Sequence, residues 1–287
     1  MKKLKYAILF ICVLILTSCD LNDDFSDKYL YTTGYPVEFA TTMLYSDYAK
    51  IESIYPNGAE KNFNITEKKK TQYSSGEIFI YSGVYNEAEL TKDLLNKNHD
   101  LRIIDATKGM SILYDIEEVW LDPSNYLMLC SNIKNSLIEY NDNVYIKENI
   151  EDNYKLLNEK ISELDVILYD IGKNGNYNSL LVTNDLFKYL EKYNIDVISI
   201  DKDIDAIDKA YASAKKKVDS KEIQYVYSLD DEVLTEAQEK FITENNLIKV
   251  NINNLFTLSD DERNSNETYI TLAKKIIDEY KKELYKK

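Results

Sequence analysis

The chain has 287 residues, 44% of them hydrophobic, which is enough to bury a core in one large or two modest domains. Its 50 acidic residues outnumber 35 basic ones and give a net charge of −15, which disfavours nucleic acid as a partner because such a surface repels phosphate. Ser-His or Cys-His catalysis would have to use the single histidine, His99. One histidine, with the one cysteine that remains once the signal peptide described below is removed, cannot supply a zinc site built on several imidazoles or thiolates.

The first 18 residues have the features of a lipoprotein signal peptide. A basic "MKKLK" precedes the 11 apolar residues "YAILFICVLIL", a run too short to span a membrane, which takes roughly 20 residues. The following "LTSC" resembles a bacterial lipobox, after which cleavage leaves an acylated Cys19. We therefore expect extracytoplasmic anchoring to the cell membrane through a lipid such as palmitate on Cys19, although a secretory signal with an incidental cysteine is the alternative.

Residues 19–28 form the predicted lipid-anchored tether, since "DLNDDFSDK" is short, polar and acidic. Loss of the signal peptide leaves 32 basic against 50 acidic residues, a net charge of −18. Only Cys130 then remains, so an intramolecular disulfide is impossible. Cys130 lies in the apolar helical stretch "NYLMLCSNI" and is expected to be a buried hydrophobic residue. His99 lies in the polar stretch "NKNHDLR" and is expected to be solvated.

Residues 29–145 alternate β-rich and helical patterns and are predicted to form an N-terminal α/β lobe. The strands are expected in "YLYTTGY", "KIESIYP", "EIFIYSG" and "LRIIDAT". Helices are expected in "VEFATTMLYSDY" and "NEAELTKDLLNK".

Residues 146–174 are predicted to be a linking helix. Apolar side chains recur at spacings of three and four, which places one stripe on a helix. They are Ile146, Ile150, Tyr154, Leu157, Ile161, Leu164, Leu168 and Ile171. The span 146–171 would be roughly 39 Å long at 1.5 Å per residue. Gly172 and Gly175 are expected to end the helix.

Residues 175–287 repeat the alternation and are predicted to form a C-terminal lobe. Strands are expected in "NSLLVTN", "DVISID", "EIQYVYS" and "IKVNIN". Helices are expected in "LFKYLEKYN", "IDAIDKAYASAKKKV", "EVLTEAQEKFITEN" and "NETYITLAKKIIDEYKKEL". The predicted fold is α/β, with two Rossmann-like lobes, mainly parallel sheets and one long helix between them.

Ligands of parallel sheets bind beyond the carboxyl ends of the strands, where loops converge. Four loops are candidates on this ground: "YPNGAEKNF", "YDIEEVWLDP", "VTNDLF" and "LFTLSDDER". The second contains Glu117 and Glu118, a pair that could act in acid/base chemistry. On an extended loop adjacent side chains point apart, so the alternative is one ligand or core contact, at Glu118, and one solvated charge, at Glu117. No nucleotide-binding, nucleophile or CxxC motif is present, so we expect no enzyme.

These loops carry a resemblance to a known family. The segments "TTGYPVEFATTMLYSDYAKIESIYPNGAE", "EIFIYSGVYNEAELTKDLLNKNHDLRIIDATKGM", "VWLDPSNYLMLCSNIKNSL" and "LLVTNDLFKYLEKYNIDVISI" occur in the order found in the zinc- and manganese-binding solute-binding lipoproteins of metal ABC importers. The resemblance covers nearly all of the mature chain. It implies two lobes on a rigid helix, with a metal ion held in the cleft between them.

The resemblance also implies positions for the metal ligands. The three histidine or carboxylate positions fall on Asn62, Glu118 and Asn184, and the fourth falls near Leu258 to Asp261, with Asp260 as the best candidate. No histidine occupies any of them. This all-oxygen set would suit Mn²⁺ or another hard cation more than Zn²⁺. The implied partner is an ABC permease, and we expect a monomer.

The missing histidines leave a second interpretation open. In a cleft that has lost its metal, the same Asn and Glu side chains would hydrogen-bond each other or water. The protein would then be a surface lipoprotein acting in protein interaction or adhesion, with Trp120 and Pro123 retained as scaffold.

Overall fold

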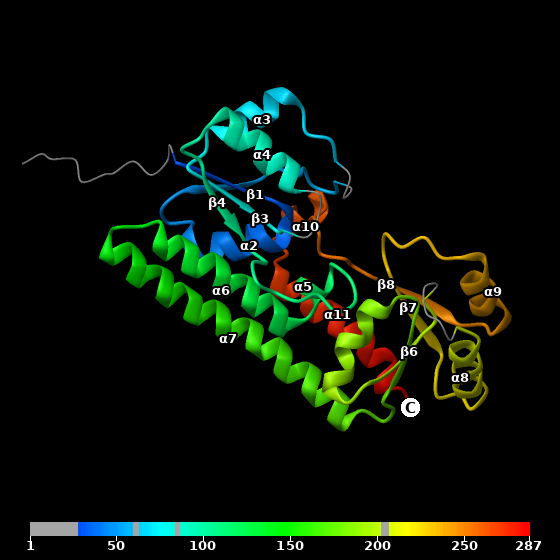
Figure 1. Cartoon of the computed structure of the whole chain (residues 1–287). Helices are drawn as coiled ribbons and strands as arrows, with labels where there is room; N and C mark the ends of the chain where they lie inside the picture. Colours follow the sequence, from blue (N-terminus) through cyan, green and yellow to red (C-terminus); the bar gives the residue numbers. More distant parts are fainter. Residues whose placement is uncertain (1–27, 60–62, 84–86, 202–206) are drawn as a thin grey trace, which may run out of the picture.

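The computed structural model describes residues 28–59, 63–83, 87–201 and 207–287. The predicted signal peptide, Cys19, most of the tether and Asn62 lie outside these ranges. The described residues form two α/β lobes side by side, joined by a long helix (Figure 1). The predicted fold class is therefore confirmed.

The first lobe contains a parallel sheet of strands in the order β2-β1-β3-β4. The central strands β1 and β3 are almost fully buried, while the edge strands β2 and β4 are partly exposed, which explains the apolar runs in the centre of the sheet. The strands are β1 (Tyr29–Thr32), β2 (Lys50–Ser53), β3 (Ile78–Tyr81) and β4 (Arg102–Asp105). The helices are α2 (Gly34–Tyr45), α3 (Glu67–Ser74) and α4 (Glu87–Lys97).

The second lobe repeats this arrangement, with a parallel sheet in the order β6-β5-β7-β8. Its strands are β5 (Ser179–Val182), β6 (Asp196–Ser199), β7 (Tyr225–Leu229) and β8 (Ile248–Ile252). Its helices are η2 (Asp185–Tyr193), α8 (Ile207–Asp219) and α9 (Glu236–Glu244). The element η2 is a 3-10 helix, where the sequence predicts only a helix, and it ends at Asn194 in the left-handed conformation.

The linking helix α7 (Val144–Asn174) extends the prediction by a few residues at both ends. Six residues of the predicted stripe are buried, from Ile150 to Ile171, and α6 (Pro123–Glu139) packs along the helix. Gly175 ends α7, but Gly172 lies inside it, so its predicted role as a terminator is wrong. A Cβ at Gly172 would come within 1.8 Å of the Tyr193 carbonyl oxygen, so this glycine permits close packing against the second lobe.

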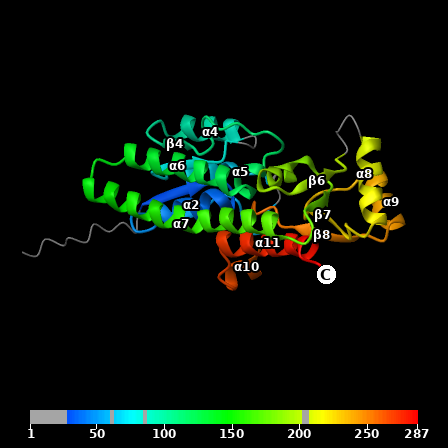
Figure 2. The ribbon, with the colours of Figure 1, turned by 90° about the horizontal axis from the view of Figure 1, so that it is seen from below.

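The remaining helices are α5 (Glu118–Leu121), α10 (Asp260–Asn264) and α11 (Tyr269–Leu284). Figure 2 shows α11 lying along α7 between the two lobes. The Tyr269 ring on α11 lies 3.9 Å from the Tyr126 ring of the first lobe, and the Tyr126 hydroxyl donates to the Pro36 carbonyl at 2.7 Å. None of the helices among the described residues is both long and apolar enough to cross a membrane.

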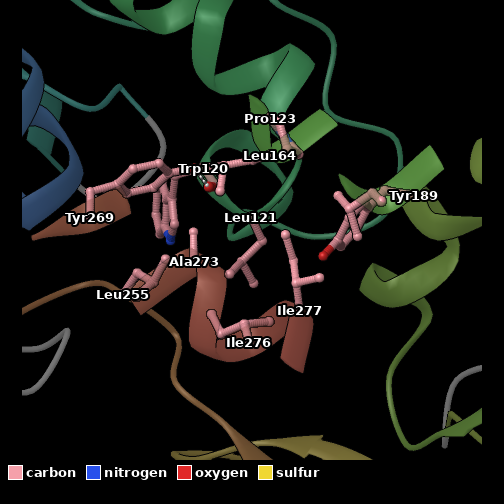
Figure 3. A pocket seen from close by; sticks show the side chains of 11 residues that line it. Trp120, Leu121, Pro123, Leu164, Tyr189, Leu255, Tyr269, Ala273, Ile276 and Ile277 are labelled. Carbon is pink, nitrogen blue, oxygen red and sulfur yellow. Dashed lines mark hydrogen bonds between the residues drawn. The ribbon is translucent and has the colours of Figure 1, made fainter. Parts of the chain in front are cut away.

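One hydrophobic core continues from the first lobe into the second. Its centre contains a small apolar cavity of about 10 Å³, walled by the Trp120 and Leu164 side chains on one side and by α11 on the other (Figure 3). Its lining contains no charged side chain and the volume is at the lower limit for one water molecule. The lobes are therefore joined by packed side chains as well as by α7.

Candidate functional site

The Trp-Leu-Asp-Pro segment acts as scaffold, as predicted. Asp122 is the N-cap of α6, with its Oδ1 accepting a hydrogen bond from the Ser124 N–H at 2.9 Å, and Pro123 occupies the first helical position. The Trp120 side chain is 1% exposed, and its Nε1 donates to the Asn254 carbonyl at 2.7 Å. The segment thereby fixes the loop after β8 against the first lobe.

Glu118 is buried and hydrogen-bonded through both of its carboxylate oxygens. Its Oε2 accepts from the N–H groups of Leu113 and Tyr114 at 3.1 and 2.9 Å, and its Oε1 accepts from Asn125 Nδ2 at 3.0 Å. The carboxylate therefore shapes the loop between β4 and α5. This is the structural role that the sequence left open beside metal ligation.

The Glu117 side chain is buried, contrary to the prediction. Its side chain is 2% exposed, so the prediction of a solvated charge is wrong. The backbone there is helical, with φ −65° and ψ −17°, because the chain is already turning into α5 and is not an extended loop. Successive side chains on a helix diverge by about 100°, and both acids point into the protein at this turn.

Asn184 forms the N-cap of η2. Its Oδ1 accepts a hydrogen bond from the Leu186 N–H at 2.8 Å, and Phe187 in the same helix is fully buried. Next to this cap, the Thr183 hydroxyl donates to Glu232 Oε2 at 2.7 Å. The Asn184 side chain therefore has a local role in starting the helix.

Asp260 is exposed in the first turn of α10. Its Oδ1 accepts from Asn57 Nδ2 at 2.7 Å. The neighbouring Arg263 makes a bidentate ion pair with Glu38, with distances of 2.8 and 2.7 Å, and also donates from Nε to Asn57. A guanidinium this close is unfavourable for a cation bound directly at Asp260.

The structure does not bring the described candidates together as a metal site. No hydrogen bond joins any two of Glu118, Asn184 and Asp260, and each contacts different partners. Among the described residues, no group of three or more His, Cys, Asp or Glu side chains is placed to hold a metal ion. His99 is exposed and Cys130 is fully buried, as expected. Burial raises the pKa of the Cys130 thiol far above its ordinary value.

A polar cavity of about 750 Å³ lies between the lobes. Its walls come from the loops that follow β2, β7 and β8, so it lies at the carboxyl ends of the strands, where the sequence predicts a site. It is lined by Gly58, Ala59, Asp230, Asp231, Asn253, Asn254, Phe256, Thr257, Ser259 and Glu262.

Among the residues that the structure describes, three carboxylates and no basic side chain line this cavity. Two of these carboxylates also stabilise the surrounding loops. Glu262 accepts hydrogen bonds from the Ser259 N–H at 2.8 Å and from Asn253 Nδ2 at 3.1 Å. Asp230 accepts from the Asn254 N–H at 3.2 Å. Asp230 and Asp231 were not among the residues predicted from the sequence. An Asp-Asp pair directly after the strand "YVYSL" was the available signal.

A comparison with protein families finds one match over most of the chain. The model described as "Zinc-uptake complex component A periplasmic" matches residues 30–283. No curated protein matches the chain.

Solved structures show the same fold. The zinc-bound ZnuA-like domain of AdcA from Streptococcus pneumoniae is 24% identical with a TM-score of 0.69, over 90% of this chain and 99% of that one. The metal-dependent lipoprotein YcdH from Bacillus subtilis is 20% identical with a TM-score of 0.72, with the same coverage. A zinc-bound AdcAII variant of Streptococcus pneumoniae is 17% identical with a TM-score of 0.71, over 90% of this chain and all of that one.

Proposed function

Because the chain belongs to the family of periplasmic zinc-uptake component A proteins, we propose that it is the substrate-binding lipoprotein of an ABC importer and that its cargo is a divalent cation. Proteins of this family are transport components and not enzymes. A permease and an ATPase in the membrane would receive the cargo.

The observation that carries this proposal is the lining of the interlobe cavity. Carboxylate, amide and hydroxyl oxygens surround it, and its described lining, which leaves out the neighbouring residues 60–62, contains neither a basic side chain nor an imidazole. Oxygen donors bind Mn²⁺, Ca²⁺ and Mg²⁺ well, whereas a scavenging zinc site uses histidine or cysteine. We therefore propose a hard cation, Mn²⁺ in preference to Zn²⁺, held weakly and partly through water.

Two ligand sets are compatible with this function. In the first, Asp230, Asp231 and Glu262 bind the cation in the cavity, which for direct contact requires them to draw closer together, because in the structure no three described acidic side chains are placed to hold a metal ion. In the second, which the family resemblance implies, Asn62, Glu118, Asn184 and Asp260 bind it. Both sets require side chains to share hydrogen bonds that they make to the protein. We favour the first because its three residues line one cavity, whereas Glu118 and Asn184 are not among the described residues of that lining.

The test is a thermal-shift titration of the mature protein with Mn²⁺, Ca²⁺ and Zn²⁺. A cation present at ten times its Kd stabilises the folded state by about 1.4 kcal/mol. We expect Mn²⁺ to raise the midpoint of unfolding, and we expect Asp230→Asn/Asp231→Asn to remove the effect. The matched control is Asp47→Asn/Asp100→Asn, which makes the same charge change at exposed positions on the amino-terminal edge of the first sheet. No shift at millimolar cation would contradict the proposal.

A second function has one observation in its favour. The oxygens of Glu118 and Asn184 already satisfy groups of the protein itself, as expected for a cleft that has lost its metal. The chain would then be a surface lipoprotein that acts in protein interaction or adhesion. Stoichiometric metal in the purified protein would contradict this alternative, and so would adjacent genes for a permease and an ATPase.

We also propose that Cys19 carries the lipid that anchors the protein, as a monomer, outside the cytoplasm. The support is the "LTSC" segment after an apolar run of 11 residues. Cells grown with labelled palmitate should yield labelled protein, and Cys19→Ala should yield unlabelled protein in the soluble extracytoplasmic fraction. Equal labelling of both forms would overturn the assignment.

A further inference from the structure

The polar cavity between the lobes is large for a bare ion. Its volume is about 750 Å³, whereas an ion with its octahedral shell of waters fills about 180 Å³, at roughly 30 Å³ for each water. Oxygens that ligate Mg²⁺ directly lie about 2.1 Å from it, so two of them are at most about 4.2 Å apart. The cavity therefore has room for an ion together with its water shell.

The carboxylates of the cavity wall already accept hydrogen bonds from the protein. Glu262 accepts through both oxygens: Oε1 from Asn253 Nδ2 at 3.1 Å, and Oε2 from the Ser259 N–H and hydroxyl, both at 2.8 Å. Asp230 Oδ1 accepts from the Asn254 N–H at 3.2 Å. A bare ion bound directly to these oxygens would compete with the donors that hold the loops.

Two amide oxygens of the wall serve the loop after β8 in the same way. Asn253 Oδ1 accepts from the Leu255 N–H at 2.7 Å, and Asn254 Oδ1 accepts from the Phe256 N–H at 2.8 Å. Water can still be bound here without breaking these bonds, because a carboxylate offers about four acceptor positions and an amide oxygen about two. The wall is thus better suited to contacts with water molecules than to direct ligation.

The first lobe fixes the position of this loop. Carbonyl groups at alternate residues of the loop accept hydrogen bonds from first-lobe donors: Asn254 from Trp120 Nε1 at 2.7 Å, Phe256 from the Tyr35 N–H at 2.7 Å, and Leu258 from the Gly58 N–H at 2.8 Å. Phe256 and Leu258 are each 2% exposed and belong to the core that both lobes share. Closing the wall around a bare ion would disturb this packing, so we expect the carboxylates to keep their positions.

Carboxylates that stay apart can still share one ion through its water shell. A carboxylate oxygen that accepts from a coordinated water lies about 4.8 Å from the ion, so two such oxygens can be up to about 9.6 Å apart. Within the described ranges, no three acidic side chains are placed to ligate an ion directly. The three carboxylates of the described lining still give the cavity a charge that attracts a cation.

We propose that the cargo of this cavity is a hydrated divalent cation, Mg²⁺ or Mn²⁺, whose complete inner shell of waters is retained and bound by Asp230, Asp231 and Glu262. This inference deepens the proposed function and rests on it. Mg²⁺ fits such a site because it gives up its waters reluctantly. Zn²⁺ has no advantage there, because its tight binding depends on direct nitrogen and sulfur ligands.

Hexaamminecobalt(III) tests the proposal, because its ammonia ligands do not exchange and it can bind only as a hydrated ion does, through an outer layer of hydrogen atoms. In competition dialysis of the mature protein at constant ionic strength, we expect it to displace Mn²⁺. In Asp230→Asn/Asp231→Asn we expect its affinity to fall by roughly tenfold or more, because two of the three charges are removed. The matched control Asp47→Asn/Asp100→Asn should bind it as the wild type does.

The bound Mn²⁺ provides a second measurement. Pulsed electron paramagnetic resonance in deuterated water counts the water molecules that remain on the ion, and we expect a complete shell. An incomplete shell would overturn the inference, and so would bound Mn²⁺ that hexaamminecobalt(III) does not displace. Equal affinity of the complex for the cavity variant and the wild type would indicate attraction to the acidic surface in general and would also overturn it.

The two measurements separate this inference from the proposed function. Stoichiometric Mn²⁺ with an incomplete water shell would leave the proposed function intact and contradict only the hydrated cargo. Binding of neither ion to the wild type would contradict both.

Discussion

At Glu118, one carboxylate satisfies three donors of the protein, two from the main chain of the preceding loop and one from Asn125. Such a group is costly to remove because each donor loses a partner in a place with little water. Replacement by alanine should therefore affect stability before it affects any ligand.

We predict that Glu118→Ala lowers the free energy of unfolding by about 1–3 kcal/mol, measured by urea denaturation, because buried donors lose their acceptor. Glu118→Gln retains an oxygen for the Leu113 and Tyr114 N–H groups and should lose less. The control is Glu159→Ala, at an exposed position on α7, which should change little. Equal stability of Glu118→Ala and the control would contradict the structural role.

Glu87 gives a prediction about pH. Its Oε2 accepts from the Ser82 hydroxyl and the Gly83 N–H, while its Oε1 is buried with no hydrogen-bond partner in the described structure. Burial raises the pKa of Glu87 above its ordinary value of 4.5, and the nearby Asp105 carboxylate acts in the same direction.

The folded state therefore holds the Glu87 proton more tightly than the unfolded state. The stability that this proton contributes is complete below pH 4.5 and is lost as the pH rises through the folded pKa. We predict that the free energy of unfolding falls more steeply above pH 4.5 in the wild type than in Glu87→Gln. The control Glu89→Gln, exposed on the same helix, should follow the wild type. Identical slopes in wild type and Glu87→Gln would refute the prediction.

The roles of single structural residues could be predicted from the sequence more fully than the residues that could bind a ligand. The Asp-Pro pair and the buried Trp120 could be predicted because capping and burial depend on local chemistry. The family resemblance predicted Asn184 as a ligand position. It did not predict that the Asn184 side chain caps η2 by accepting from the Leu186 N–H, because that role depends on the local helix start. Asp230 and Asp231 were missed because their importance depends on loops from both lobes meeting.

At the scale of elements, hydrophobic periodicity predicted all eight strands and most helices. It missed α3, where only Tyr73 and Ser74 are buried and no apolar stripe exists, and it missed α10, which has no buried residue. It also missed α5, which at four residues is too short to show a period. Such helices depend on their caps: the Thr66 side chain caps the first, and Ser259 with Glu262 forms a capping box for the second.

The contact of α7 with the end of η2 gives a prediction at this scale. Gly172 is required because a Cβ would overlap the Tyr193 carbonyl, which is a backbone atom and cannot rotate away. We predict that Gly172→Ala lowers the free energy of unfolding by about 1–3 kcal/mol despite the better helix propensity of alanine. Lys173→Ala, exposed one residue later, is the control. A Gly172→Ala protein at least as stable as the wild type would show that the two helices are not closely packed.

At the scale of the whole molecule, the alternation of strands and helices was sufficient to predict two lobes, and the apolar stripe was sufficient to predict their connecting helix. The continuous core between the lobes was not predictable, because it depends on α11 packing against both. This core joins the lobes through packed side chains and leaves the polar cavity as the space for the proposed cargo.

Equilibrium dialysis of the mature protein against Mn²⁺, followed by elemental analysis, tests the central claim most directly. We predict one Mn²⁺ per chain at saturating millimolar concentration and no stoichiometric Mn²⁺ in Asp230→Asn/Asp231→Asn. The Asp47→Asn/Asp100→Asn control should retain the ion. If the wild type binds no stoichiometric metal, or if the cavity variant binds as well as the wild type, a cation site formed by these carboxylates is contradicted.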